Sequence, residues 1–392
     1  MPPATRRSPL ALIFLTVFID LVGFGIVIPV LPLYAERFGA SPLVIGLLLG
    51  VYSFMQFLCA PLLGKLSDRI GRRPVLIASL FGTAAGFLLM GLAKTLALLF
   101  VARVIDGATG GNLSTAQAYI ADVTPPERRS RSMGLIGAAF GLGFIFGPAI
   151  GGLLSRLSPA APVFFAAVLA LANTLAVAIF LPESLPAERR QRARARTSFA
   201  TLFHGRVGIS LGGVLVVYFL TTVAFSLLTA IYPLFTERRF GYDALHNGAI
   251  FAGQGVLSAV VQGALLGRLL RIFKEKGLAV AGAILLAAGM FALPVGHSLA
   301  LLLAATAAVA VGHGLMAAPL NGLASKCADE TAQGRALGVM QSAASLARIV
   351  GPVLGGWLLH YDAMTQTVHF GRTPFWTSGA ILVMAGVLAL AL

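Results

Sequence analysis

The sequence predicts an all-α membrane protein with twelve transmembrane helices, arranged as two six-helix halves related by pseudo-two-fold symmetry. Apolar residues make up 58% of the 392 residues and charged residues only 11%, whereas about 25% of the residues in a typical soluble domain are charged. The apolar residues form runs of roughly 20, the length that a helix needs to cross the hydrocarbon core of a bilayer. The second half of the chain also repeats motifs of the first half.

The apolar runs place the helices along the chain. The first run, from Leu10 to Tyr34, is too long for the apolar part of a signal peptide and no cleavage pattern follows it, so we expect it to remain as the first helix. We predict an N-terminal half over 1–181, an arginine-rich cytoplasmic linker over 182–207 and a C-terminal half over 208–392. The predicted helices are 10–35, 43–63, 75–93, 96–121, 132–154, 162–181, 208–235, 246–266, 278–294, 299–324, 336–359 and 374–392.

The basic residues indicate how the chain crosses the membrane. Of the 29 Lys and Arg residues, 21 fall on one side of the predicted topology, six on the other, and two, Arg103 and Arg348, within helices. Because cytoplasmic loops carry the excess of Lys and Arg, both termini are predicted to be cytoplasmic. The net charge of +15 is therefore a topology signal and does not indicate a nucleic-acid partner. The Ala- and Arg-rich composition and short loops favour a multi-pass protein of the bacterial inner (plasma) membrane.

No enzyme, cofactor or metal site is predicted. Cys59 and Cys327 are the only cysteines, too few for a disulfide framework or a cysteine metal site. The sequence lacks a helical His-Glu-x-x-His, a nucleophile elbow and a phosphate-binding Gly-x-x-x-x-Gly-Lys-Ser/Thr, so neither catalysis nor ATP-driven transport is predicted. The expected partners are the lipid bilayer, protons and a small-molecule substrate, and the expected state is a monomer.

The two halves share sequence at a nearly constant offset. Residues 147–154 read GPAIGGLL and residues 351–358 read GPVLGGWL, 204 positions apart, and the helix ends at 31–36 (LPLYAE) and 232–237 (YPLFTE) also match. Six helices per half give both halves the same orientation, so the repeat runs around an axis along the membrane normal. Two such halves around a central site are the architecture of alternating access.

Residues 64–75, GKLSDRIGRRPV, carry the most specific motif. We predict a cytoplasmic loop here, in which the glycines permit a tight turn and close helix approach. Asp68 lies among cationic side chains and can act as a conformational latch, by pairing with a neighbour or with a helix N-terminus. Anchoring at the cytoplasmic face would explain the arginines but not the spacing of Asp and Gly. The predicted latch comprises Gly64, Asp68, Arg69, Gly71, Arg72 and Arg73.

This motif resembles in full the signature G-x-L-x-D-R-x-G-R-R of the major facilitator superfamily. Residues 103–107 (RVIDG) resemble the R-x-x-x-G motif in helix 4 of that family, and residues 143–152 (GFIFGPAIGG) resemble the G-x-x-x-G-P-x-x-G-G motif of its drug:proton antiporter branch. The resemblance implies the twelve-helix fold of this superfamily and proton-coupled antiport.

Each of these two helical motifs also has a structural interpretation. Arg103 and Asp106 are spaced i, i+3 and can simply neutralise each other, or they can take part in proton transfer, as the resemblance implies. In 143–152, small residues four apart allow close helix packing and the proline bends the helix; an antiport role comes from the resemblance alone. The predicted antiporter motif comprises Gly143, Gly147, Pro148, Gly151 and Gly152.

Asp20, in the middle of the first predicted helix, is the most informative carboxylate. Residues 18–32 closely resemble helix 1 of tetracycline/proton antiporters. A carboxylate balanced between desolvation and a nearby cation can bind a proton in one state and release it in another; the alternative is a hydrogen-bonded structural acid. Polar residues at helical spacing mark further cavity faces. The predicted proton-coupling and substrate residues are Asp20, Gln56, Arg103, Asp106, Asn112, Gln254, Gln262, Gln341 and Arg348.

The resemblance to tetracycline/proton antiporters covers nearly the whole chain but has gaps. Those transporters carry functional aspartates in helices 3 and 9, where this chain has Gly86 and Leu286, and well-known members carry a histidine in helix 8, where it has Ser258. A shared fold does not identify a substrate. The sequence therefore predicts the class of transporter rather than tetracycline as the transported molecule.

We expect a secondary active transporter that exports a small molecule, drug or tetracycline-like, in exchange for protons. One alternative is a proton-coupled importer or facilitator of a metabolite, which the motif at 143–152 disfavours. Another is a membrane receptor or scaffold without transport, which the charges inside the predicted helices disfavour, because a scaffold has little use for them.

Overall fold

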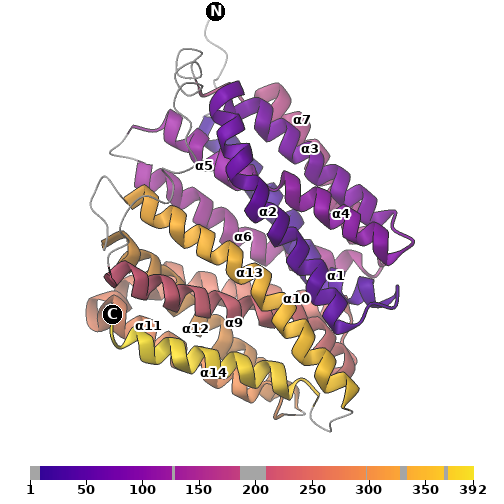
Figure 1. The fold of residues 1–392 in the computed structure, drawn as a ribbon, viewed down its shortest axis with the longest axis vertical. Helices are drawn as coiled ribbons and strands as arrows, with labels where there is room; N and C mark the ends of the chain where they lie inside the picture. Colours follow the sequence, from indigo (N-terminus) through magenta and orange to yellow (C-terminus); the bar gives the residue numbers. More distant parts are fainter. Residues whose placement is uncertain (1–8, 126–128, 186–208, 297, 327–332, 366–369) are drawn as a thin grey trace, which may run out of the picture. The chain divides into compact units, whose positions relative to one another are not determined.

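The computed structural model describes residues 9–125, 129–185, 209–296, 298–326, 333–365 and 370–392, which are helical throughout apart from short connections and contain no strand (Figure 1). Ten of their helical segments are long and apolar enough to cross a membrane. One of the ten, Ala244–Ala292, has 49 residues, more than twice the ~20 that one crossing needs. The count of twelve crossings stays a prediction. The predicted linker over 182–207 lies outside the described residues from 186 onward.

Contacts divide the chain into two compact units. Unit 1 consists of 1–30 and 55–204, and unit 2 of 31–54 and 205–392. Helices α1 (Pro9–Glu36) and α2 (Pro42–Ile70) contribute to both units. The residues 31–54 therefore pack with later parts of the chain.

Unit 1 is organised around α3, which packs against α7 and α4. Its core includes Leu76, Leu80 and Tyr119, together with residues of α1. The helices that belong wholly to this unit are α3 (Arg72–Gly91), α4 (Leu96–Thr109), α5 (Asn112–Val123), α6 (Arg129–Leu154) and α7 (Ala161–Phe180).

Unit 2 contains the remaining helices. α11 packs against α12 and α14, and α13 packs against α9. Its core includes Val217, Met316 and Leu320. The helices of this unit are α9 (Ile209–Phe240), α10 (Ala244–Val260), the π-helix η3 (Val261–Leu265), α11 (Leu266–Ala292), α12 (Leu299–Lys326), α13 (Gln333–Met364) and α14 (Arg372–Ala389).

The stretch predicted as a loop at 64–75 is helical except at one residue. α2 continues to Ile70 and α3 begins at Arg72, so the loop prediction is wrong. The chain turns at Gly71, whose φ of 115° lies in a region that residues with a side chain rarely adopt. Gly64 lies inside α2 with no atom within 4 Å of the position of an added Cβ, so it does not mediate the predicted close helix approach.

The predicted helix 96–121 is broken. α4 ends at Thr109, α5 begins at Asn112, and Gly110 and Gly111 join them. The carbonyl of Gly110 accepts a hydrogen bond of 3.0 Å from Nε2 of Gln56 in α2. A broken membrane helix leaves backbone groups without their usual partners, and these are tolerated where protein groups satisfy them. The break also gives Asn112 the first position of a new helix.

The polar residues of the predicted helix 246–266, among those expected to mark a cavity face, are interrupted by η3. Gln254 and Ser258 precede this π-helix, and Gln262 lies within it. A π-helix changes the angular register of the residues that follow. Gln254 is buried, whereas Gln262 is exposed, so the two glutamines do not share one environment. α11 is also kinked, at Lys274, where φ is 54°.

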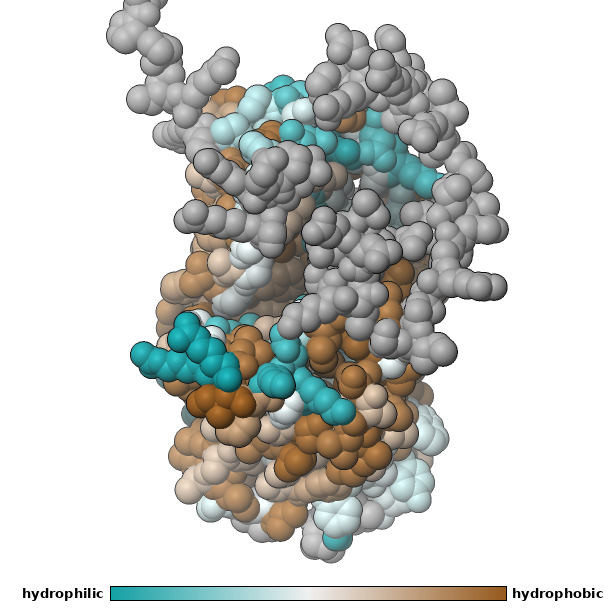
Figure 2. Space-filling view, turned by 90° about the vertical axis from the view of Figure 1, so that its left-hand side faces the viewer, coloured by the Kyte–Doolittle hydropathy of each residue, from teal (hydrophilic) through white to brown (hydrophobic). Residues whose placement is uncertain are grey.

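Large apolar side chains are exposed on many helices. Val168, Ile179, Ile272 and Ile284 are all at least 64% exposed. On the face drawn in Figure 2, brown apolar residues adjoin one another over much of the coloured surface. A water-soluble protein rarely exposes such extensive apolar areas, and these side chains are suited to contact lipid.

Candidate functional site

Asp20 lies near the middle of α1 and is bound by Asn112. The amide Nδ2 of Asn112 donates a hydrogen bond of 2.9 Å to Oδ1 of Asp20. Asn112 is only 4% exposed, and among the described residues its own Oδ1 has no hydrogen-bond partner. The helix break before Asn112 thus places one donor against Asp20 and leaves one buried acceptor beside it.

Arg103 and Asp106 form a buried ion pair within α4. Nη1 of Arg103 lies 2.8 Å from Oδ2 of Asp106, and their side chains are 2% and 5% exposed. Thr83 of α3 also hydrogen-bonds to the Asp106 carboxylate. The structure therefore contains the neutralising ion pair, which was one of the two interpretations of this spacing. A role of the two residues in proton transfer stays a prediction.

Gly86, where the resemblance suggested an aspartate, leaves room for Asp106. A Cβ added to Gly86 would lie 2.8 Å from Cβ of Asp106 and 3.2 Å from the carbonyl oxygen of Ala102. Such distances are shorter than ordinary van der Waals contact, so any side chain at this position would push against α4. The carboxylate at this place in unit 1 comes from α4 instead of α3.

Charges in this part of unit 1 do not balance. Arg103 pairs with Asp106, while the ion pairs of the described residues include no cation for Asp20. A carboxylate inside the membrane without a counter-charge is costly when ionised. Its charge therefore responds to any change in its surroundings, which suits a group that binds and releases a proton.

The other predicted site residues belong to both units. In unit 1, Gln56 bonds to Gly110 at the helix break. In unit 2, Gln254 is buried with its Nε2 unpartnered among the described residues, and Gln262 and Gln341 are exposed. Arg348, also in unit 2, donates from Nη2 to the hydroxyl of Ser345 over 3.2 Å. Within unit 1 the structure thus pairs Asp20 with Asn112 and Arg103 with Asp106.

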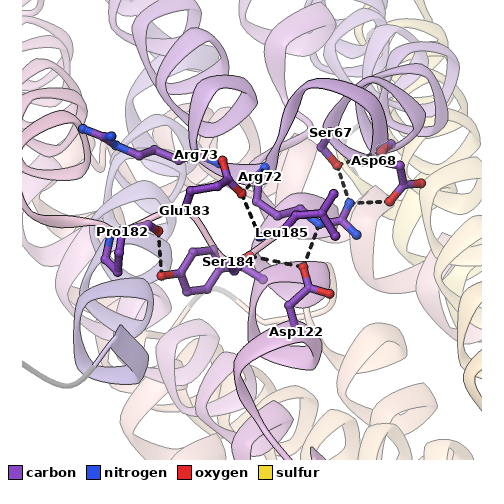
Figure 3. A network of polar contacts seen from close by, with 11 residues as sticks. Ser67, Asp68, Arg72, Arg73, Asp122, Pro182, Glu183, Ser184 and Leu185 are labelled. Carbon is purple, nitrogen blue, oxygen red and sulfur yellow. Dashed lines mark hydrogen bonds and ion pairs between the residues drawn. The ribbon is translucent and has the colours of Figure 1, made fainter. Parts of the chain in front are cut away.

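Arg72 is the hub of the predicted latch (Figure 3). Its guanidinium lies 2.6 Å from Asp68 and donates to the hydroxyl of Ser67 over 2.7 Å. Its Nε lies 3.0 Å from the carboxylate of Asp122 at the end of α5. Arg72 is buried, whereas Asp68 is 47% exposed at its side chain. The latch therefore depends on one buried arginine that connects α2, α3 and α5.

The same network includes two acids that the sequence reasoning missed. Glu183 accepts hydrogen bonds from the backbone N–H groups of Arg72 and Arg73, at 2.9 and 3.2 Å, and so caps the N-terminus of α3, where Gly71 offers no side chain. Asp122 binds Arg72 and accepts from Ser184 over 3.2 Å. Both acids lie near the predicted cytoplasmic ends of helices. Their negative charge, opposite to that of the basic motif at 64–75, is the feature of the sequence that could have identified them.

The second latch arginine is also engaged. Nη2 of Arg73 donates to the carbonyl oxygen of Ala178 in α7. Arg69 is exposed. Among the six predicted latch residues, the ion pair of Asp68 and Arg72 joins α2 to α3, and Arg72 and Arg73 contact α5 and α7.

The glycines of the predicted antiporter motif form a packing face. A Cβ added to Gly147 would lie 2.6 Å from Cα of Gly25 in α1, and one added to Gly151 would lie 2.8 Å from the carbonyl oxygen of Ile26. A Cβ added to Gly143 would lie 2.7 Å from Cβ of Leu21. The backbone of α6 therefore lies in direct contact with α1 at these glycines. These contacts agree with the structural interpretation of the motif, in which small residues allow close helix packing. Pro148 and Gly152 are buried in the same stretch.

The repeat in sequence is also a repeat in contacts. Gly351 and Gly355 in α13 correspond to Gly147 and Gly151 in α6 at the offset of 204. A Cβ on Gly351 would lie 2.0 Å from the hydroxyl of Ser226 in α9, and one on Gly355 would lie 2.8 Å from Leu227. Corresponding helices thus approach each other at corresponding glycines in the two units.

Comparisons with known proteins agree with these features. The pattern of the Major Facilitator Superfamily matches residues 13–330 and 214–392. The chain is 32% identical over 392 residues to the class H tetracycline resistance protein of Pasteurella multocida, covering 96% of this chain and 94% of the relative. It is 35% identical over 362 residues to the class C tetracycline resistance protein of Escherichia coli, covering 89% of each.

A solved structure is similar over the full length. The crystal structure of the human organic anion transporter MFSD10 (TETRAN) has a TM-score of 0.73 and 26% sequence identity to this chain, and covers 99% of it and 100% of the human chain. The match of the family pattern over most of the chain and relatives above 30% identity at nearly full length show the family. This chain belongs to the Major Facilitator Superfamily and is a membrane transporter rather than an enzyme.

Proposed function

We propose that this protein is a secondary active transporter that exports a small, drug-like molecule in exchange for protons by alternating access. The observation that carries the proposal is Asp20, a carboxylate in α1 with an amide donor and no cation among its described partners. In such a place, proton binding and release change the charge of a membrane-embedded group, and a transport cycle can use this change. The similarity to tetracycline resistance proteins supports export over import.

Asn112 is suited to bind Asp20 in both of its protonation states. The ionised carboxylate accepts from Nδ2, as in this structure. A protonated Asp20 carries an O–H donor, and the free Oδ1 of Asn112 is a buried acceptor next to it. Arg103, a cation in the same unit, is paired with Asp106 in this arrangement. The proposed exchange therefore uses Asp20 as proton carrier, with Asn112 positioning it.

The proposal includes the organisation predicted from the sequence. Two six-helix halves, 1–181 and 208–392, would move about a central site, with both termini in the cytoplasm of a bacterial cell and the protein a monomer in the inner membrane. The network around Arg72 is the proposed latch, because breaking its ion pairs would free α2 and α3 from the end of α5. The repeated glycine contacts support two similar halves.

The test is proton release from liposomes. Purified protein is reconstituted with an internal pH-sensitive dye, a proton gradient is imposed, and a drug panel that includes tetracycline is added. Export coupled to protons gives substrate-dependent proton movement that disappears in Asp20→Asn. If a labelled substrate crosses without moving protons, the protein is a facilitator; if uptake rises with an inward proton gradient, it is an importer.

A further inference from the structure

Arg348 is a membrane-embedded cation that the proposed proton path does not use. It lies in the middle of α13, and the ion pairs of the described residues do not include it. Ser345, one turn earlier on the same helix, is its hydrogen-bond acceptor among those residues. A charge at membrane depth is costly and normally faces a partner or a wet cavity. Among the described residues, Arg348 therefore has a neutral hydrogen-bond partner and no counter-charge.

The position of Arg348 on α13 keeps it away from the apolar surface. Leu346 and Val350 are 45% and 37% exposed. Arg348 is two residues from each of them, and two residues correspond to roughly 200° around an α-helix. It is itself partly exposed. Arg348 therefore lies on the side of α13 opposite to these exposed apolar residues.

α2 packs against α13 beside Arg348. A Cβ added to Gly50 would lie 3.5 Å from the carbonyl oxygen of Ile349 in α13. Tyr52 is two residues after Gly50, and Arg348 is the residue before Ile349. Tyr52 interacts electrostatically with the guanidinium, and all four residues belong to unit 2.

α9 also packs against α13 beside Arg348. The hydroxyl of Ser226 donates a hydrogen bond of 3.1 Å to the carbonyl oxygen of Ala347, the residue before Arg348. Tyr218 lies about two turns before Ser226 on the same helix and interacts electrostatically with Arg348. Three helices of unit 2 therefore contribute one guanidinium and two phenol groups that interact with it electrostatically.

The chemistry of these groups selects for negative charge. A guanidinium presents its N–H donors in a planar fork that matches a carboxylate, and Ser345 occupies one of them in this structure. Phenol hydroxyls are uncharged donors at neutral pH, and their rings offer an apolar surface to the rest of a ligand. An ammonium group would meet a like charge here without a carboxylate to offset it.

We propose that Arg348, Tyr52 and Tyr218 form an anion subsite, which binds the carboxylate or another planar acidic group of a transported aromatic molecule. This inference deepens the proposed function and rests on it, since it names the chemical class of a substrate. It assigns Arg348 to substrate selection and leaves proton coupling to Asp20.

Equilibrium binding with matched probes tests the subsite. The purified full-length protein in lipid nanodiscs is titrated with 2-naphthoate, with its neutral analogue 2-naphthamide and with 2-naphthyltrimethylammonium. The wild type should bind the carboxylate about tenfold more tightly than the amide, the usual scale of a charge-assisted hydrogen-bond pair. Arg348→Gln should abolish this preference, and Arg348→Lys should keep part of it, because lysine keeps the charge but loses the fork.

Two sets of variants keep the test decisive. Arg372→Gln is the matched control, because Arg372 belongs to unit 2 but stacks on Trp376, with its Cζ 3.9 Å from the ring centroid, and should bind like the wild type. Should Arg348→Gln fail to fold, Tyr52→Phe and Tyr218→Phe remove one donor each and should each weaken 2-naphthoate severalfold without affecting 2-naphthamide. Equal binding of all three probes, or an unchanged carboxylate preference in the folded variants, overturns the proposal.

This experiment is independent of the antiport test, because binding is measured without a proton gradient. Anion-selective binding without substrate-linked proton release would uphold the subsite and contradict antiport. Proton release driven by cations or neutral drugs, with no carboxylate preference, would uphold antiport and overturn the subsite.

Discussion

The amide of Asn112 donates to the carboxylate of Asp20 over 2.9 Å, although 92 positions separate them in the sequence. The contact exists because α4 ends at Thr109 and a new helix starts at Asn112. It joins the proposed proton carrier in α1 to a break in the fourth predicted span. The two residues are therefore the first place to test the mechanism.

Asn112→Leu should lower substrate-linked proton exchange about tenfold, since it removes a hydrogen bond to a charged group at little change in volume. The liposome assay measures this, together with the pH profile of exchange, which a purely structural role would leave unchanged in shape. Asn173→Leu is the matched control: Nδ2 of Asn173 donates to the carbonyl oxygen of Thr16, also in α1, over 3.0 Å. It should reduce stability without altering the pH profile. An unchanged profile in Asn112→Leu would remove Asn112 from the mechanism.

Arg72 and Asp122 should be coupled energetically. Arg72→Gln leaves two acids without their cation, and Asp122→Asn leaves Arg72 with Asp68 and Ser67. Because the side chains of Arg72 and Asp122 are only 10% and 14% exposed, we expect a coupling free energy of about 1–3 kcal/mol in a double-mutant cycle. Thermal unfolding in detergent measures stability and the liposome assay measures transport rate. Additive effects of the two substitutions would show that the pair does not act as a unit.

Gly147→Ala should cost far more than the same change at Gly141. Both glycines lie in α6, but an added Cβ at 147 would lie 2.6 Å from Gly25, whereas no atom lies within 4 Å of one at 141. Overpacking of a tight contact typically costs about 1–3 kcal/mol, while Gly→Ala in open space favours a helix by up to about 1 kcal/mol. Thermal unfolding of both variants compares them directly. Equal stability of the two would mean that α6 and α1 can separate without loss.

The Asp243 cap should lose its effect in acid. Partial burial acts in the opposite direction, but hydrogen bonds from the backbone N–H and the ring of His246 hold the pKa of Asp243 below its ordinary value of 3.8. A lowered pKa means that the folded state favours the ionised form. Asp243 therefore stabilises the protein above pH 3.8, and the stabilisation disappears as the pH falls below this value.

Asp243→Ala removes the N-terminal cap of α10 and should lower stability by about 1 kcal/mol at neutral pH. The difference between the wild type and this variant, measured by thermal unfolding, should shrink as the pH approaches and passes below 3.8. A difference that stays constant over this range would mean that the carboxylate charge is not what stabilises α10.

Patterns local to one helix were readable from the sequence. Long apolar runs predicted membrane helices because lipid requires every backbone group to be bonded within the segment. The spacing of Arg103 and Asp106 allowed an ion pair as one of two interpretations, because residues three apart on a helix are neighbours. The offset of 204 predicted that Gly351 and Gly147 are equivalent, and both lie at close contacts with equivalent helices.

Contacts between distant segments were decided by the tertiary structure. Nothing in the composition of 64–75 indicates that α2 would run on to Ile70, or that Glu183 would cap α3 from 111 positions away. Nor does periodicity distinguish a straight helix from one broken at Gly110, or a regular stripe from one shifted by a π-helix. Hydropathy reports how apolar a segment is, whereas ligand binding and proton transfer depend on which polar groups lie near one another. Only the packing of α2, α9 and α13 places Tyr52 and Tyr218 where they interact electrostatically with Arg348.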